Sequence, residues 1–133
     1  IQAQILELMM DMQKKTGMTV LLITHDMGVV AQTCDRVVVM YAGNVVEAGT
    51  VHDIIKKTRH PYSKGLLAAV TLYEEEKRLR TIPGSVPDLI EIPPGCPFSP
   101  RCEYVMDKCK KEKPKLYEVE PGHLVACYLE GEL

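Results

Sequence analysis

Apolar residues near the start of the chain recur at helical spacing. Ile1, Ile5 and Leu8 fall on one stripe, and this spacing predicts an amphipathic helix over residues 1–16. Gly17 follows directly and is suited to end the helix in a left-handed conformation. Because Ile1 already lies inside the pattern and no Ser, Thr, Asp or Asn precedes it as a cap, we expect the chain to be part of a longer protein.

The next apolar stretch, residues 19–24, is continuous rather than alternating. Such a run is typical of a strand covered on both faces, as in the parallel sheet of an α/β protein. His25 and Asp26 come directly after it, at the end of a strand where open α/β sheets bind ligands. The pair is therefore a candidate functional site. The alternative is that Asp26 caps a short helix over residues 27–34 and that His25 is an ordinary loop residue.

Two β-branched runs, residues 36–41 and 45–49, are separated by the turn Ala42-Gly43-Asn44. A connection this short predicts an antiparallel hairpin. A strand buried on both faces also needs neighbours, and we expect the partners of residues 19–24 to lie in a part of the protein before Ile1.

Helical signals return after the hairpin. Thr50 is placed to cap a helix over residues 51–58, and Pro61 occupies the favoured first position of another helix.

The composition changes after residue 82, where prolines and glycines punctuate the chain. Such a stretch predicts an extended linker. We therefore expect three parts: a globular part over residues 1–72, a linker over 73–95 and a cysteine-rich extension over 96–133.

Four of the five cysteines lie in this last part, at Cys96, Cys102, Cys109 and Cys127, with five, six and seventeen residues between them in turn. The region has few apolar residues with which to build a core, so we expect a covalent or metal staple. The fifth cysteine, Cys34, lies between a predicted helix and a predicted strand and is expected to be a small buried residue.

Three interpretations of the four cysteines are open. Two disulfides would require an oxidising compartment, and the sequence carries no sign of secretion. Structural zinc sites usually have ligand pairs separated by two to four residues, which is tighter than the intervals here. An iron–sulfur cluster held by four thiolates allows wider intervals, because the chain wraps a larger inorganic core. The spacing alone leaves all three open and modestly favours the cluster.

Charge argues against nonspecific binding to polyanions. The chain carries 16 basic and 18 acidic residues, a formal net charge of −2, which does not predict attraction to nucleic acid or anionic membranes. No apolar run reaches the ~18–20 residues of a membrane-spanning helix. Lysines do crowd the cysteine region, at Lys108, Lys110, Lys111, Lys113 and Lys115. They are interpreted as a solvated face, as compensation of a negative thiolate cluster, or as part of a cysteine-stapled nucleic-acid module. Interspersed acidic residues argue against the last interpretation.

With these residues in view, the sequence resembles the C-terminal part of an ABC-transporter ATPase subunit. The resemblance covers essentially the whole chain and is nearest to the subgroup that serves oligopeptide and dipeptide importers, with the related nickel importers. The first part of the chain resembles the broad ATPase family, and the tail is what distinguishes this subgroup within it. The resemblance rests on Leu22-Ile23-Thr24-His25-Asp26-Met27-Gly28-Val29-Val30, Asp35-Arg36-Val37-Val38-Val39-Met40-Tyr41-Ala42-Gly43, Val46-Glu47-Ala48-Gly49, His60-Pro61-Tyr62-Ser63-Lys64-Gly65-Leu66-Leu67, and the tail from Ile82-Pro83-Gly84 through Gly95-Cys96-Pro97-Phe98-Ser99-Pro100-Arg101-Cys102.

The resemblance implies an α/β fold, the C-terminal portion of an ABC-type ATPase domain. This portion would hold a partial, mostly parallel sheet, a β-hairpin and helices, followed by an irregular cysteine-rich tail. It implies that His25 is the switch histidine, which reaches the γ-phosphate of ATP and helps to poise it for attack by water. Asp26 is expected to be structural. The four tail cysteines would ligate a [4Fe–4S] cluster, with Zn²⁺ as the alternative.

In this family such a subunit binds ATP with Mg²⁺ and hydrolyses it to power import of oligopeptides or dipeptides across the cytoplasmic membrane. The implied partners are a second ATPase subunit, membrane-spanning permease subunits and, indirectly, a periplasmic or extracellular peptide-binding protein. Nucleic acid is not among them. The implied location is the cytoplasmic side of the cell membrane, as a peripheral protein. The phosphate-binding loop G-x-x-x-x-G-K-[ST] is missing from this sequence, so we expect the chain alone neither to bind nor to hydrolyse ATP.

Two other functions stay open. One is a metal-stapled regulatory or interaction module without an ATPase role, and the other is a nucleic-acid-binding module. Exposed strand edges also predict pairing between copies, so the isolated chain is expected to form a homodimer.

Overall fold

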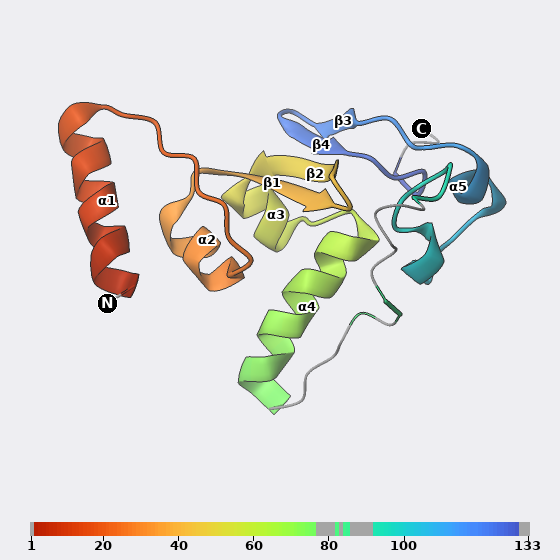
Figure 1. Ribbon diagram of the computed structural model, residues 1–133, viewed down its shortest axis with the longest axis horizontal. Coiled ribbons are helices and arrows are strands. Elements are labelled where there is room, and N and C mark those ends of the chain that lie inside the picture. Colours follow the sequence, from red (N-terminus) through yellow and green to blue (C-terminus); the bar gives the residue numbers. More distant parts are fainter. Residues whose placement is uncertain (1, 77–81, 83, 86–91, 131–133) are drawn as a thin grey trace. The chain divides into compact units, whose positions relative to one another are not determined.

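The structure is a computed structural model that describes residues 2–76, 82, 84–85 and 92–130 (Figure 1). The chain divides into two compact units, Ile1–Asp35 and Arg36–Leu133. About half of the predicted linker over residues 73–95 lies outside the described residues, and the division into three parts stays a prediction.

Helix α1, Gln2–Thr16, opens the first unit. Gly17 follows with φ +70°, and its amide donates to the carbonyl oxygen of Gln13 at 2.9 Å. This left-handed residue satisfies one of the carbonyl groups that the last helical turn leaves free. The predicted helix and its glycine stop are confirmed.

The segment after Gly17 is not a strand. Residues 19–24 form no ladder with any strand of the described chain, and the side chains of Leu21 and Ile23 are 87% and 91% exposed. An extended segment becomes a strand only where a neighbour pairs its amides and carbonyls. The predicted buried strand is therefore wrong for the described chain.

Helix α2, Met27–Thr33, begins at the cap that the sequence predicts. The Oδ1 atom of Asp26 accepts hydrogen bonds from the amides of Gly28 at 2.9 Å and Val29 at 3.1 Å. These bonds satisfy two of the four free amides at the helix start. The structural interpretation of Asp26 is confirmed.

The second unit contains a four-stranded sheet with the order β1-β2-β4-β3. Its strands are β1 (Arg36–Tyr41), β2 (Asn44–Thr50), β3 (Tyr117–Glu120) and β4 (His123–Val125). Every pairing is antiparallel. The hairpin of β1 and β2 is confirmed, whereas the mostly parallel sheet and the irregular tail are wrong.

The tail strands join the sheet because β2 has an open edge. Glu47 pairs with Val125 and Ala48 with Leu124, and the amide of Ala126 donates to the carbonyl of Val46 at 2.9 Å. An unpaired edge leaves a row of free backbone groups, which β4 satisfies here. The pairing places the segment that precedes Cys127 beside the hairpin.

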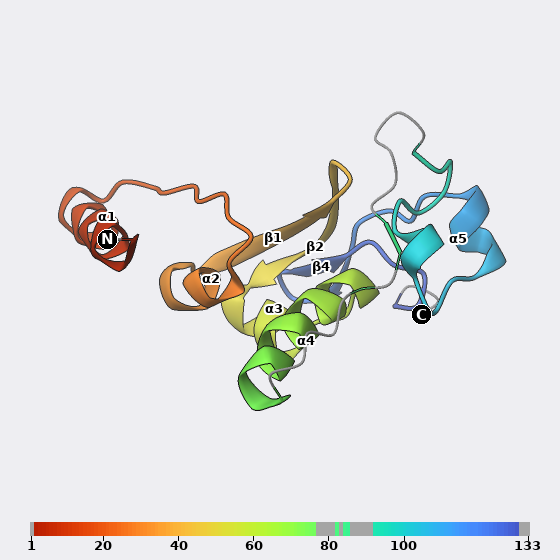
Figure 2. The same ribbon diagram turned by 60° about the horizontal axis from the view of Figure 1, so that its bottom comes forward.

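Two helices follow the hairpin along the chain. Helix α3, Val51–Lys56, starts at a capping box in which Thr50 and Asp53 bond each other's backbone amides. It contacts β2 and β1 (Figure 2). Ile54, a residue of this helix, is fully buried. Helix α4, Pro61–Glu76, begins at the predicted proline.

The cysteine-bearing segments gather at the hairpin-turn end of the sheet (Figure 1). They include a short 3₁₀ helix, η1 (Ser99–Arg101), and helix α5 (Asp107–Lys111). Lys113 contacts the side chain of Asn44 at the start of β2, so the tail is bonded to the hairpin at this end of the sheet. Among the described residues no helix combines the length and the apolar character that crossing a membrane requires.

Candidate metal centre

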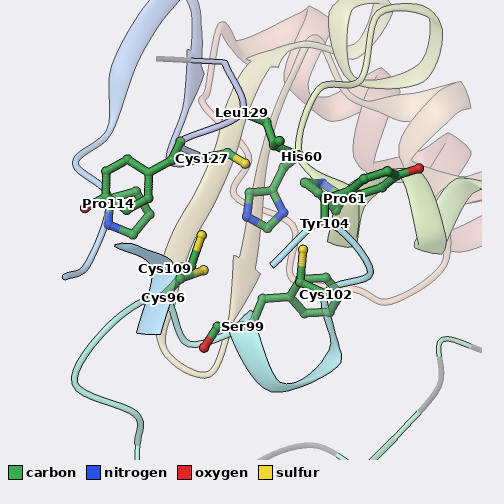
Figure 3. Close-up of a pocket in the computed structure, with 12 residues that line it drawn as sticks. His60, Pro61, Cys96, Ser99, Cys102, Tyr104, Cys109, Pro114, Cys127 and Leu129 are labelled. Carbon is green, nitrogen blue, oxygen red and sulfur yellow. The ribbon is translucent and has the colours of Figure 1, made fainter. Parts of the chain in front are cut away.

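The four predicted cysteine ligands line one cavity (Figure 3). Cys102 directly follows η1, Cys109 lies within α5, and Cys96 and Cys127 come from the loops before η1 and after β4. All are free thiols, so the two disulfides considered from the sequence are not formed. Cysteines up to 31 positions apart in the sequence therefore converge on one cavity, which their spacing alone could not predict.

Backbone contacts fix two of these cysteines against each other. The amide of Cys96 donates to the carbonyl oxygen of Cys109 at 2.7 Å. A Cβ atom at Gly95 would fall on that same carbonyl oxygen, well inside van der Waals contact. Only glycine allows the two segments to approach this closely, because it has no Cβ.

Burial disfavours the thiolate form at three of the four sites. It raises the pKa of Cys96 and of Cys102, and it raises the pKa of Cys127 to about 11. Neighbouring thiols of the same cavity add to the rise. Amide donors act in the opposite direction: Phe98 and Ser99 bond Cys96, Tyr104 bonds Cys102, and Leu129 bonds Cys127. Amides directed at sulfur suit thiolate ligands, yet the thiolates need a bound cation to stay ionised here.

The four sulfur atoms are not arranged to coordinate one metal ion. Across the described residues, no three His, Cys, Asp or Glu side chains approach closely enough to hold one metal ion. A zinc ion bound by four thiolates would need all four sulfur atoms ~2.3 Å from one point. What the structure provides is thus the donor set: four free thiols on one cavity, three of them with amide donors.

An aromatic cluster joins this cavity to the hairpin and to α4. Phe98, which is 3% exposed, packs against Tyr41 with ring centroids 5.2 Å apart and against Tyr62 at 5.4 Å. Tyr41 and Tyr62 meet edge to face at 4.7 Å. Such pairs stabilise by ~0.5–1.5 kcal/mol beyond their buried area. The start of α4 and the loop of Cys96 are therefore one packed unit.

A buried carboxylate organises the backbone before α4. Glu47 is fully buried and accepts hydrogen bonds from the amides of Arg59 at 2.8 Å and His60 at 3.1 Å. Thr58 and His123 complete its shell at 3.1 and 2.8 Å. A buried carboxylate is tolerated only with such partners. Glu47 thereby positions His60 from strand β2.

His60 is a site residue to which the sequence alone gave no role. It is 1% exposed and lines the cysteine cavity (Figure 3). Its place directly before the proline that starts α4 was visible in the sequence. Its ring accepts a hydrogen bond from the nearby amide of Tyr62 at 3.1 Å. Its place in the cavity also depends on contacts with Glu47 and Phe98, which are distant in sequence and could not be predicted from local sequence.

The remaining candidates lie in the first unit. His25 is exposed at the bend immediately before α2, and nothing in the structure assigns it a ligand. Cys34 is half-buried rather than buried, with its sulfur 3.7 Å from the hydroxyl of Thr33. It does not line the cysteine cavity.

Comparisons with known proteins show similarity to peptide-transport proteins. Residues 46–109 match the family model described as "Oligopeptide/dipeptide transporter, C-terminal region". The oligopeptide transport ATP-binding protein AppD of Bacillus subtilis is 48% identical over 133 residues, 99% of this chain and 40% of its own length. A probable peptide ABC transporter ATP-binding protein, y4tR of Sinorhizobium fredii, is 44% identical over 135 residues, 100% of this chain and 40% of its own. The dipeptide transport ATP-binding protein DppD of Escherichia coli is 43% identical over 129 residues, 96% of this chain and 39% of its own.

The chain thus spans about two fifths of the length of the curated relatives that it matches. The family model covers most of β2, both helices α3 and α4, and three of the four site cysteines. Since the identity also extends over nearly the whole chain, the chain is similar to the C-terminal region of ATP-binding subunits of oligopeptide and dipeptide ABC transporters.

Proposed function

We propose that this chain serves in an ATP-binding subunit that uses ATP and Mg²⁺ to power import of oligopeptides or dipeptides. The observation that carries the proposal is the 43–48% identity to peptide-transport ATP-binding proteins along nearly the entire chain. Such a subunit acts with a second ATPase subunit and membrane-spanning permeases at the cytoplasmic face of the membrane. A substrate-binding protein delivers the peptide to the permeases.

The proposed role of His25 is to contact the γ-phosphate of ATP. Its position supports this role, because it is an exposed imidazole next to the capped start of α2. An imidazole N–H can donate a hydrogen bond to a phosphate oxygen, and charged acceptors strengthen such bonds. Phosphoryl transfer depends on this kind of positioning and charge stabilisation.

The four cysteines are proposed to hold a [4Fe–4S] cluster. Its inorganic core would cross-link the tail, which has few apolar residues with which to form a core. The donor set supports this assignment, because clusters of this kind take four cysteine thiolates and all four thiols line one cavity. The intervals between the cysteines also favour a body larger than one ion. A single zinc ion would require a tighter shell than the described residues form.

ATP turnover requires parts that this sequence does not contain. A phosphate-binding loop of the G-x-x-x-x-G-K-[ST] type is missing from the 133 residues. We therefore propose that the isolated chain does not hydrolyse ATP. The alternatives of a regulatory module or a nucleic-acid binder are not favoured, since the relatives are named as peptide-transport ATP-binding proteins.

The proposal is tested by replacing His25 with alanine in the full-length subunit, assembled with its permeases. ATP hydrolysis is expected to fall by about 100-fold or more, in the range seen when one transition-state donor is removed, while nucleotide binding persists. Phosphate release and binding of a fluorescent ATP analogue measure the two effects separately.

Asp26→Asn provides the matched control for this experiment. Asparagine caps helices as well as aspartate does, so α2 keeps its start while the neighbouring charge is removed. This variant should retain hydrolysis close to the wild-type rate. Unchanged turnover in His25→Ala would contradict the proposed role of His25.

A further inference from the structure

Arg101 lies between two of the site cysteines and bonds parts of the chain that are far from both. It is the last residue of η1, directly before Cys102, and it is half-buried. Nη1 of its guanidinium donates to the hydroxyl oxygen of Tyr41 at 3.3 Å, and Nη2 donates to the carbonyl oxygen of Ile82 at 2.9 Å. The side chain therefore bridges the end of strand β1 and a described residue of the predicted linker.

The linker lies close against this side chain and against α4. Gly84 has φ +81°, and a Cβ atom there would lie 3.3 Å from Cγ of Arg101. Ile82 in turn fills space beside α4, because a Cβ atom at Gly65 would lie only 2.8 and 2.9 Å from its Cγ1 and Cδ1 atoms. The two glycines thus let the linker approach both elements, since neither has a side chain to exclude it.

The backbone of η1 carries this anchoring on to Cys102. The amide of Arg101 donates to the carbonyl oxygen of Phe98 at 3.0 Å, and the amide of Cys102 donates to that of Ser99 at 3.4 Å. Phe98 also packs against the ring of Tyr41, with centroids 5.2 Å apart. Cys102 therefore follows a short bonded turn that Phe98 and Arg101 both fasten to Tyr41.

The four cysteines differ in how the chain holds them. The amide of Cys96 bonds the carbonyl of Cys109 at 2.7 Å, and Cys127 follows Ala126, whose amide bonds strand β2 at 2.9 Å. Cys102 is half-buried, whereas the other three are buried. Packing and backbone bonds between distant segments place the buried three, so Cys102 is the cysteine whose position depends most on a side-chain anchor.

We propose that Arg101 is a positioning residue of the cysteine site, which presets Cys102 by fastening its loop to β1 and to the linker. The inference rests on the proposed cluster at these cysteines and adds the linker to the support of the site. A side chain that orients a ligand in advance spares the cost of ordering that ligand during binding. A guanidinium suits this role, because its fixed fork of donors can bond two acceptors at once. Arg101 acts through Cys102 rather than by contact with the bound group.

Alkylation of the free thiols tests the position of Cys102 without any bound group. The full-length subunit, freed of metal, is treated with iodoacetamide, and mass spectrometry follows each of the four cysteines separately. Arg101→Met keeps much of the length of the side chain but loses both hydrogen bonds. We expect Cys102 to react about tenfold faster or more in this variant, the effect on local opening of losing bonds from a charged donor. The rates at the other three cysteines should stay unchanged.

Two further variants separate positioning from general stability. Arg36→Met removes another guanidinium of the same unit, one that donates to the carbonyl of Gly122 at 3.4 Å, and should leave all four rates unchanged. Tyr41→Phe removes one bond of Arg101 and keeps the aromatic packing, so we expect an intermediate rate at Cys102. This variant also decides the question if Arg101→Met does not fold. Unchanged reactivity of Cys102, or an equal rise at all four cysteines, would overturn the positioning role.

Release of the bound group distinguishes this inference from the cluster proposal on which it rests. Iron and sulfide are quantified in protein purified without oxygen, and transfer of iron to a chelator is followed over time. We expect iron to leave Arg101→Met about tenfold faster than wild type, because the outer partners of a ligand change metal affinity by about 10–100-fold. Equal release rates would overturn the role of Arg101 and leave the cluster proposal intact. Absence of iron and sulfide from the wild-type protein would overturn the cluster proposal, whereas the alkylation rates would still decide whether Arg101 positions Cys102.

Discussion

Gly95 controls how closely the backbone of one site cysteine approaches that of another. The neighbouring Cys96 amide bonds the Cys109 carbonyl at 2.7 Å, and a side chain at Gly95 would occupy the position of that oxygen. The contact is between two backbones, so no flexible side chain can yield. The geometry of the cysteine cavity therefore depends on the absence of one methyl group.

Replacing Gly95 with alanine is expected to separate the two segments. The overpacking should destabilise the protein by ~1–3 kcal/mol and lower the iron content of anaerobically purified protein. Gly43→Ala is the control, because Gly43 has φ +73° but open space around it. That variant should cost ~1–2 kcal/mol from backbone conformation with normal iron content. Wild-type iron content in Gly95→Ala would refute the role of this contact.

Residues whose roles are local were predicted from the sequence. Gly17 as a helix stop, Asp26 and Thr50 as caps, and Pro61 as a helix start each follow from neighbours within four positions. His60 escaped prediction for the opposite reason. The amide of Tyr62 bonds its ring locally, but its place in the cavity depends on residues of strand β2 and of the loop of Cys96, which the chain brings together only after folding.

At the scale of elements, the pairing of neighbouring strands could be predicted, whereas the pairing of strands far apart in sequence could not. The hairpin of β1 and β2 was predictable because a short turn dictates its register. The pairing of β4 with β2 was not, because it joins segments about eighty positions apart with only two paired residues on each strand. A continuous apolar run at residues 19–24 indicated a buried strand, but such a run says nothing about which neighbours cover it.

Ion pairs fasten the tail strand β3 to the segment after α3. Glu120 bonds Lys57 at 2.7 Å and Arg59 at 2.8 Å, and its side chain is 32% exposed. Hydrogen bonds from these two residues hold the pKa of Glu120 below its ordinary value. Being partly exposed, the pairs are screened by water and salt and contribute modestly.

Glu120→Gln is expected to reduce stability slightly at pH 7. The pKa of Glu120 is lower in the folded than in the unfolded state, so its contribution is present above the ordinary glutamate pKa of about 4.3. That contribution is lost as the pH falls through the folded pKa. Thermal unfolding of variant and wild type should therefore differ at pH 7, converge near pH 3, and differ less in 1 M salt. A difference that persists unchanged at pH 3 would contradict the ion-pair explanation, and Glu112→Gln, at an exposed position, serves as the control.

At the scale of the whole molecule, the two compact units carry different chemistry. The first unit holds the candidate phosphate contact His25, and the second holds the cysteine cavity with its aromatic and carboxylate supports. The resemblance read from the sequence is confirmed by the comparisons, because its motifs are short stretches of local sequence. The convergence of four cysteines on one cavity is a property of the folded second unit, built by the hairpin, α4 and the tail strands together.

The central claim is that these four cysteines form a single cluster site. Its most direct test is to measure iron, acid-labile sulfide and zinc in full-length protein purified without oxygen, alongside Cys109→Ser and Cys34→Ser. We predict a brown protein with the iron and sulfide of one [4Fe–4S] cluster per chain, loss of both in Cys109→Ser, and retention of both in Cys34→Ser, because Cys34 does not line the cavity. A colourless anaerobic protein that contains stoichiometric zinc, or four free thiols without iron, would contradict the claim.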